Sequence, residues 1–139
     1  MLVNQISVFI ENKPGRVNQL AEVLSKNGIN LLTLSIADTK DYGILRAITR
    51  DNEKAVKILK EEGFTVSCTD LIGVEVEDKP GGLASILKIF DDENISIEYL
   101  YSYARTSDTN AIILFRVENI DNALKILKKK NIKLISKVF

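Results

Sequence analysis

Two short segments of the sequence combine a polar residue, a lysine, a proline and a glycine in the same order. They are ENKPGRV at 11–17 and EDKPGGL at 77–83, and they hold both prolines of the 139-residue chain. Pro14 and Pro80 suit the first turn of a helix, where backbone N–H groups have no helical partner. Free N–H groups at the positive end of a helix dipole favour carboxylates and phosphates. Each segment is therefore a candidate anion-binding helix start.

The first segment offers polar and bare positions at such a helix start. Asn12 is predicted to cap the helix, with its side chain accepting a hydrogen bond from the N–H of Gly15. Gly15 has no Cβ, so a ligand could approach its backbone closely. Asn30 opens the second predicted strand, and we expect the helix and the returning strand to bring it near the turn. Its amide offers a donor and an acceptor, which suits a zwitterionic amino acid.

The second segment carries different polar groups at the matching positions. Asp78 is the expected cap, and it is followed by the bare positions Gly81 and Gly82. Ser96 stands where the first half has Asn30. The negative charge of Asp78 suits an ammonium better than a carboxylate. A plainer interpretation also fits both copies: Pro-Gly simply starts a helix, and Asn30 bonds the backbone at the entry of a strand.

The two segments belong to a duplication that covers the whole sequence. Apolar residues alternate before each proline, and after it they follow the i, i+3, i+4, i+7 spacing of an amphipathic helix. The offset between the halves is 66 residues from Pro14 to Pro80 and 68 further on, which places two extra residues in a hairpin loop of the second half. The matched apolar positions are Ile6, Val8 and Ile10 with Ile72, Val74 and Val76, and Val17, Leu20, Ala21 and Leu24 with Leu83, Ile86, Leu87 and Phe90.

Paired residues also mark the ends of the predicted helices. All four helices stop at glycine or asparagine, which most readily adopt the left-handed conformation that ends a helix. The second helix of each half follows an aspartate or asparagine, and both are good N-caps. The matched pairs are Gly28 with Asn94, Gly63 with Asn131, and Asp51 with Asn119.

Each half reads strand, helix, strand, strand, helix, strand. This βαββαβ order is the ferredoxin-like arrangement of an α+β protein, with both helices on one face of a four-stranded antiparallel sheet. We expect two such domains, 1–70 and 71–139, side by side and without a linker. The predicted strands span about 2–11, 29–38, 43–50, 64–70, 71–77, 95–105, 110–118 and 132–138, and the helices about 13–27, 52–62, 80–93 and 120–130.

The composition excludes most catalytic chemistry. There is no histidine, so histidine nucleophile pairs, general bases and metal ligands are absent. Cys68 is the only cysteine, which rules out a CxxC motif and an intrachain disulfide and fits a reducing, cytoplasmic location. Neither a Walker-type phosphate loop nor GxGxxG occurs. We expect no cofactor, no metal and no enzymatic activity.

Charge and hydropathy bear on the partners. Lysine plus arginine is 19 and aspartate plus glutamate is 19, so the balanced chain is not drawn strongly to nucleic acid or to an anionic membrane. No apolar run reaches the ~18 residues that a membrane span needs. The first ten residues alternate like a strand and lack the charged region of a signal peptide. We expect no nucleic-acid partner and no membrane partner.

Two apolar features suggest further packing. The third strands, GILRAI and AIILFRV, are apolar on both faces, and a single helix layer covers only one. A second chain is the obvious cover for the other face, so we expect a homodimer. Tyr99, Tyr101 and Tyr103 share one face of a strand, which indicates cross-strand packing, an oligomer interface, an aromatic wall beside a ligand, or an RNA-stacking platform.

The segments ENKPGRVNQLAEVLSKNGINL and EDKPGGLASILKIFDDENISI resemble the opening of ACT domains, the small regulatory units of amino-acid metabolism. The resemblance covers essentially the whole chain as two tandem copies, and it is to the stand-alone tandem ACT proteins. It implies paired domains that form one eight-stranded sheet and amino-acid effectors bound where two domains meet. Asp78 and Ser96 depart from the amide pattern of the family, so the first copy looks the better site. The ligand contacts that the resemblance implies are Asn12, Gly15, Arg16, Asn30, Asp78, Gly81, Gly82 and Ser96.

Three functions follow from these observations. The leading one is a non-catalytic regulatory protein that binds an amino acid near the Pro-Gly turns, at the inter-domain interface, and acts on an enzyme or regulator in trans. A small acylphosphatase-like enzyme on the same fold is an alternative, for which Arg16 beside Gly15 is the only fair phosphate ligand. A scaffold that binds another protein without any ligand is the third.

Overall fold

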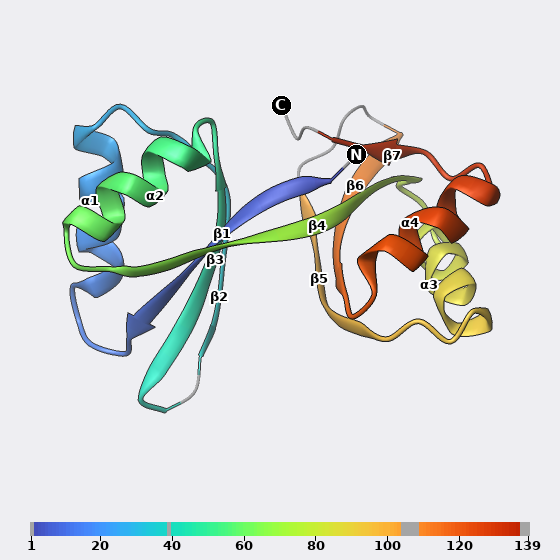
Figure 1. Ribbon diagram of the computed structural model, residues 1–139, viewed down its shortest axis with the longest axis horizontal. Coiled ribbons are helices and arrows are strands. Elements are labelled where there is room, and N and C mark those ends of the chain that lie inside the picture. Colours follow the sequence, from blue (N-terminus) through green and yellow to red (C-terminus); the bar gives the residue numbers. More distant parts are fainter. Residues whose placement is uncertain (1, 39, 104–108, 137–139) are drawn as a thin grey trace. The chain divides into compact units, whose positions relative to one another are not determined.

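The chain folds into two compact units (Figure 1). The N-terminal unit comprises Asn4–Thr69, and the C-terminal unit comprises the described residues from Asp70 onward together with Leu2 and Val3. The expected domain boundary after residue 70 stays a prediction. The computed structural model describes residues 2–38, 40–103 and 109–136.

The N-terminal unit has the predicted βαββαβ order. Its antiparallel sheet has the strand order β2-β3-β1-β4, with β3 paired to both β1 and β2. Both helices cover the same face of this sheet (Figure 1). The elements are β1 (Val3–Glu11), α1 (Arg16–Lys26), β2 (Leu31–Asp38), β3 (Tyr42–Thr49), α2 (Asn52–Glu61) and β4 (Thr65–Glu77).

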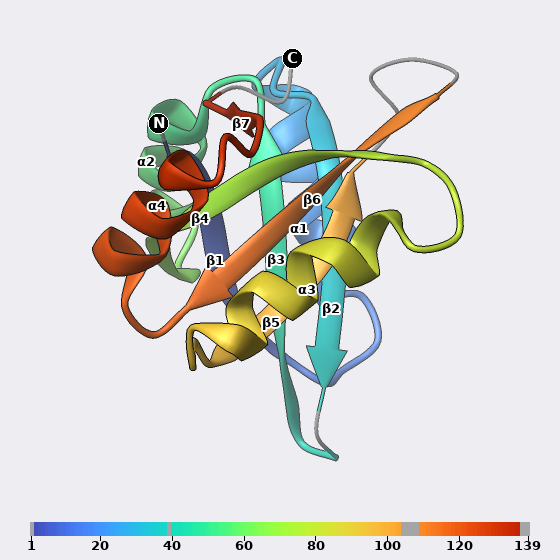
Figure 2. The same cartoon turned by 90° about the vertical axis from the view of Figure 1, so that its right-hand side faces the viewer.

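The C-terminal unit repeats this arrangement, and the predicted ferredoxin-like fold is confirmed. β4 pairs with both β6 and β7, and β5 lies at the outer edge beside β6. Figure 2 shows both helices of this unit in front of its strands. The elements after β4 are α3 (Gly82–Asp92), β5 (Ile97–Tyr103), β6 (Asn110–Val117), α4 (Ile120–Lys129) and β7 (Leu134–Ile135).

β4 is one continuous strand of 13 residues, although the sequence predicted two strands, 64–70 and 71–77. No proline or turn dipeptide interrupts TVSCTDLIGVEVE, so nothing ends the strand between the halves. The strand predicted at 95–105 runs past Tyr103 into residues outside the described part of the chain. The same holds for the end of the strand predicted at 132–138.

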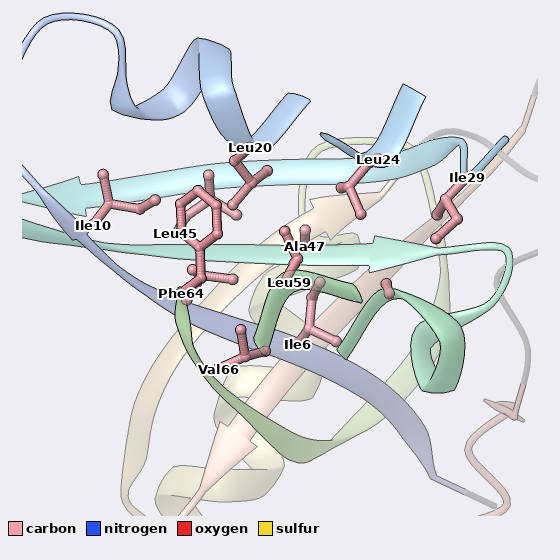
Figure 3. Close-up of a cluster of buried hydrophobic side chains, with 12 residues drawn as sticks. Ile6, Ile10, Leu20, Leu24, Ile29, Leu45, Ala47, Leu59, Phe64 and Val66 are labelled. Carbon is pink, nitrogen blue, oxygen red and sulfur yellow. The ribbon is translucent and has the colours of Figure 1, made fainter. Parts of the chain in front are cut away.

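The core of the N-terminal unit lies between its helices and its sheet (Figure 3). Leu20 and Leu24 of α1 and Leu59 of α2 have at most 1% of their surface exposed. The stripe predicted for α1 is therefore confirmed at Leu20 and Leu24, whereas its first residue, Val17, is 37% exposed. Strand residues meet them on alternate positions, as expected for a sheet with one covered face. The sheet and loop side of the core consists of Ile6, Val8, Ile10, Ile29, Leu45, Ala47, Phe64 and Val66.

The C-terminal core takes its aromatic side chains from other positions. Phe90 of α3 meets Phe115 of β6 edge to face, with ring centroids 5.1 Å apart and an interplanar angle of 80°, a favourable aromatic geometry. The N-terminal core instead contains Phe64, whose counterpart in the second half is Ile132. The cores are therefore filled from different positions, and position 132 carries no ring.

All four helices end as predicted. Gly28, Gly63, Asn94 and Asn131 have φ angles of 70°, 86°, 55° and 56°, in the left-handed region. The residue after each of them donates its N–H to the carbonyl five residues earlier, at 2.8–3.0 Å, which is the Schellman pattern. The glycine–asparagine pairing in the sequence is therefore a pairing of helix ends.

The N-caps predicted for α2 and α4 are also confirmed. The side chain of Asp51 accepts from the N–H of Lys54 at 3.0 Å. The side chain of Asn119 accepts from the N–H of Asn122 at 3.1 Å. Among the described helices, none is long and apolar enough to cross a membrane.

The third strand of the C-terminal half is buried on both faces, as its apolar pattern predicts. Phe115 belongs to the helix-side core, and Ile112 and Leu114 on the other face are 2% and 0% exposed. These side chains are already buried in a single chain, so this strand does not require a second chain as its cover, and the homodimer stays a prediction. Tyr101 and Tyr103 lie opposite Leu114 and Ile112 in the β5–β6 register, which fits the interpretation of cross-strand packing.

The matched N-caps of α2 and α4 allow a test of whether the two halves are stabilised in the same way. We expect Asp51→Ala and Asn119→Ala each to lower the free energy of unfolding by about 1 kcal/mol, because each leaves a helical N–H without its acceptor. Asp51→Asn keeps the acceptor and is the control. Urea denaturation measures all three variants, and a cost for Asp51→Asn as large as that for Asp51→Ala would contradict the capping role.

Candidate functional site

The first Pro-Gly segment is a reverse turn that precedes the helix. The N–H of Arg16 donates to the carbonyl of Lys13 at 3.4 Å, and Gly15 has φ 90° and ψ −14°. Proline at the second position and a glycine with positive φ at the third are typical of a type II turn. Helix α1 then begins at Arg16 with Gly15 as its N-cap. The predicted helix start at residue 13 was therefore wrong.

The second Pro-Gly segment has the same geometry. The N–H of Gly82 donates to the carbonyl of Lys79 at 3.0 Å. Gly81 has φ 91° and ψ −12° and is the N-cap of α3. A Cβ added at Gly15 or Gly81 would meet nothing within 4 Å, so the backbone conformation, and not crowding, is what favours glycine at these two positions.

Asn12 and Asp78 are not the helix caps that the sequence predicted. Neither helix receives a cap hydrogen bond from a side chain, because the turn places three residues between the polar residue and the helix. Asn12 instead donates from its N–H to the carbonyl of Asp41 and from Nδ2 to the carbonyl of Lys40, both at 3.0 Å. The N–H of Asp78 donates to the carbonyl of Thr109 at 2.7 Å. Both residues fasten the turn to the neighbouring strand connection.

Asn30 lies at the opposite end of its unit from the first Pro-Gly turn, contrary to the prediction. Glu11, which leads into the turn, pairs with Tyr42 at the start of β3. Leu31, which follows Asn30, pairs with Thr49 at the end of β3. β3 spans eight residues, or roughly 25 Å. The prediction failed because β1 and β2 run in the same direction, so α1 carries the chain back along the whole sheet before β2 begins.

Ser96 has the same position in the C-terminal unit. Its carbonyl accepts from the N–H of Glu118 at 3.4 Å, just beyond the end of β6, whereas Asp78 meets Thr109 just before β6 begins. Asn30 and Ser96 are both exposed. In each unit, the four predicted ligand residues therefore divide into three at the Pro-Gly turn and one at the far end of the sheet.

A hollow of about 390 Å³ lies beside the second turn, and we call it the Gly82 hollow. It contains two of the predicted residues, Gly81 and Gly82, together with charged residues that the sequence reasoning missed. These come from β4, from the turn itself (Lys79), and from the connection between α4 and β7, which the β4–β7 pairing brings to the turn. The lining residues are Glu75, Val76, Glu77, Lys79, Gly81, Gly82, Ser85, Ile86, Asn131, Ile132 and Lys133.

The charged residues of the Gly82 hollow form two ion pairs. Lys133 Nζ lies 2.7 Å from a carboxylate oxygen of Glu75, whose side chain is only 9% exposed. Asn110 Nδ2 donates to the other oxygen of Glu75 at 2.9 Å. Lys79 pairs with Glu77 at the rim, where both side chains are mostly exposed. The lining therefore offers two carboxylates and two ammonium groups.

The lysine–glutamate pair at the rim exists at both turns. Lys13 Nζ lies 2.8 Å from Glu11 Oε2, and the hydrogen bond and charge of Lys13 hold the pKa of Glu11 below its usual value. A signal for this pair was present in the sequence, because both segments read glutamate, polar residue, lysine, proline, glycine. Sequence reasoning concentrated on the asparagine and aspartate and overlooked it.

Asp78 and Asn30 line other hollows. Asp78 lies in an adjacent hollow of about 450 Å³ with Thr109 and Asn110, which shares Glu77 and Lys79 with the Gly82 hollow. Asn30 lies in one of about 300 Å³ at the end of α1, far from the first turn. Among the described residues, no group of three or more cysteine, aspartate or glutamate side chains is placed to hold a metal ion.

Arg16, the predicted anion ligand of the first turn, packs against the protein itself. Its guanidinium carbon lies 4.4 Å from the ring centroid of Phe64, and Nη1 donates to Gln19 Oε1 at 2.8 Å. Its Nε is buried without a hydrogen-bond partner among the described residues. The side chain therefore covers the place between the first turn and the connection from α2 to β4.

The two turns differ in whether the helix start can carry a side chain. A Cβ at Gly82 would lie 2.1 Å from the carbonyl oxygen of Glu77, a backbone atom that cannot rotate away. We expect Gly82→Ala to lower the free energy of unfolding by about 2 kcal/mol or more. Arg16→Ala at the matching position should cost less than about 1 kcal/mol, since only the contact with the ring and an exposed hydrogen bond to Gln19 are lost. Thermal or urea denaturation compares the two, and equal costs would contradict this difference.

Comparison with known proteins identifies the family. The chain matches the family model described as an ACT domain pair over residues 1–138. It is 41% identical to protein BT0572 from Bacteroides thetaiotaomicron, covering 97% of this chain and 92% of that one, with a TM-score of 0.90. No curated protein matches the chain.

Two more distant structures share the fold alone. The regulatory subunit of aspartate kinase from Thermus thermophilus, in its ligand-free form, is 17% identical, with a TM-score of 0.62 and coverage of 92% of this chain and 93% of that one. Aspartate kinase from Synechocystis is 20% identical with a TM-score of 0.56, and the match covers 91% of this chain and 24% of that one. The duplicated βαββαβ units, the paired Pro-Gly turns and the family match agree, and the chain belongs to the family of ACT domain pairs.

Proposed function

We propose that this protein is a non-catalytic regulatory protein that binds a single amino acid beside a Pro-Gly turn and acts on an enzyme or regulator in trans. The observation that carries the proposal is the Gly82 hollow. Its lining combines two carboxylates with two ammonium groups, and its volume is near the lower end for small-molecule pockets. Opposite charges in a small hollow suit a small zwitterion better than a purely anionic or cationic ligand.

The family supports the regulatory part of this proposal. ACT domains are regulatory modules, and the Thermus thermophilus structure with the same fold is a regulatory subunit. The resemblance noted from the sequence implies amino-acid effectors for such modules. Because fold alone does not fix function, the ligand is argued from the lining of the hollow.

The enzyme alternative has less support. An acylphosphatase-like site needs an arginine that is available to a phosphate beside the first turn. The guanidinium of Arg16 rests on Phe64 and donates to Gln19, so a phosphate would have to displace both contacts. The scaffold alternative has no ligand, and it would leave the charged lining of the Gly82 hollow without a role.

A ligand screen tests the proposed function. We expect one or a few of the twenty standard amino acids to bind saturably in isothermal titration calorimetry. At a concentration of 100 times Kd, ligand binding stabilises the folded protein by about 2.7 kcal/mol. For a chain of this size the melting temperature then rises by roughly 5–10 °C.

The outcomes separate the three functions. Failure of every amino acid to bind, or to raise the melting temperature, would contradict the proposal. An activity that hydrolyses an acyl phosphate would favour the enzyme, provided that this activity remains with the protein through purification and is abolished by Arg16→Ala. A partner protein that remains bound whether or not amino acids are present would favour the scaffold.

A further inference from the structure

The two Pro-Gly turns differ at one pair of positions that meet in space. In the first half, Arg16 begins the helix and Phe64 follows the second helix. The matching residues of the second half are Gly82 and Ile132, and both line the Gly82 hollow. The first copy therefore has an arginine side chain packed on an aromatic ring, where the second copy has a glycine and an isoleucine.

In the first copy the chain fills this place with its own side chain. The guanidinium of Arg16 lies over the Phe64 ring at 4.4 Å. Phe64 itself is 4% exposed, so the ring is fixed in the core. Gln19 holds the guanidinium from the next turn of α1. A ligand that entered between the first turn and Phe64 would have to displace a cation–π contact and a hydrogen bond.

In the second copy the same place cannot be filled from position 82. The carbonyl oxygen of Glu77 occupies the space of a Cβ at Gly82, so the helix begins without a side chain. Ile132 supplies an apolar wall that is smaller than a ring, with Ile86 of α3 beside it. The opening is therefore enforced by the backbone.

The charges around the opening are arranged to take both ends of a zwitterion. Glu75, largely buried, is the acceptor suited to an ammonium group, while Lys79 and Lys133, largely exposed, are suited to a carboxylate. Both ion pairs can exchange one partner for a ligand group of the same sign without leaving a buried charge unpaired. Val76, Ile86 and Ile132 leave room for an apolar side chain between these charges.

We propose that the amino acid binds at the second turn alone, one per chain, and that Arg16 is a built-in occupant of the first. This inference rests on the proposed function and specifies its site. It reverses the ranking from the sequence, in which Asn12 and Asn30 made the first copy the better site. The ligand class is an amino acid with an uncharged, apolar side chain, held by Glu75, Lys79 and Lys133.

A matched pair of lysine variants tests the site. Lys79 and Lys13 occupy the same position in the two turns, make the same pair with a glutamate and are similarly exposed, so neither substitution threatens the fold. With the best-binding amino acid of the screen as the probe, Lys79→Ala should weaken binding about tenfold, the loss of one charge-assisted contact. Lys13→Ala should change Kd by less than about twofold, and calorimetry should give one amino acid per chain for the unmodified protein.

A second pair of variants tests the site by changing the space available at each turn. Ile132→Phe places the ring of the first copy in the second and should reduce binding at least about tenfold, because the Gly82 hollow is filled. Arg16→Ala empties the first copy and should leave the Kd of the probe within about twofold. The melting temperature of each unliganded variant reports whether it is folded.

The results separate this inference from the proposed function. If no amino acid binds the unmodified protein, the proposed function fails. If an amino acid binds but Lys13→Ala or Arg16→Ala weakens it while Lys79→Ala and Ile132→Phe do not, the site assignment is overturned and the function stands. Two amino acids per chain would also overturn the inference.

Discussion

One backbone angle decides how each half of this protein is built. Gly15 and Gly81 have φ angles near +90°, a region that other residues adopt only under strain. Each glycine lets a type II turn end the first strand and start the helix within four residues. The direction of the helix, the stripe that it buries and the side chains beside the turn all follow from this reversal. Proline before the glycine restricts the turn further.

The duplication conserved this backbone frame and varied what fills it. Both halves end their helices on a left-handed residue and cap α2 and α4 with a side-chain oxygen. The two cores differ, however, in where their aromatic side chains stand: the first contains Phe64, and the second contains Phe90 and Phe115. Ile132, the counterpart of Phe64, therefore places no aromatic ring beside the second Pro-Gly turn. The Gly82 hollow is lined by this isoleucine and by Gly82, where the carbonyl of Glu77 leaves no space for a side chain.

The sequence was sufficient to predict the fold. Apolar spacing located the four helices, and the glycine–asparagine pairs located their ends, because both signals depend on local backbone and burial preferences. The prediction was less accurate where one sequence pattern is compatible with two local backbone structures. Pro-Gly fits both the first turn of a helix and a type II turn, and the structure has the second. TVSCTDLIGVEVE was divided into two strands because the repeat suggested a boundary there.

The site was predictable only in part, since its residues meet through the topology of the sheet. Asn30 was placed beside the turn, but the parallel direction of β1 and β2 sets it at the far end. Lys133 and Glu75 are 58 positions apart and meet because β7 pairs with β4. The role of Arg16 depended on a contact with Phe64, 48 positions away. No local pattern records either contact.

The most direct test of this account follows backbone amides during titration with the amino acid that binds best. Amide proton–nitrogen correlation spectra resolve the glycine at each turn. We expect Gly81, Gly82 and Lys133 to shift as the amino acid is added, while Gly15 and Arg16 stay in place. Shifts confined to Gly15 and Arg16 would contradict the assignment of the ligand to the second turn.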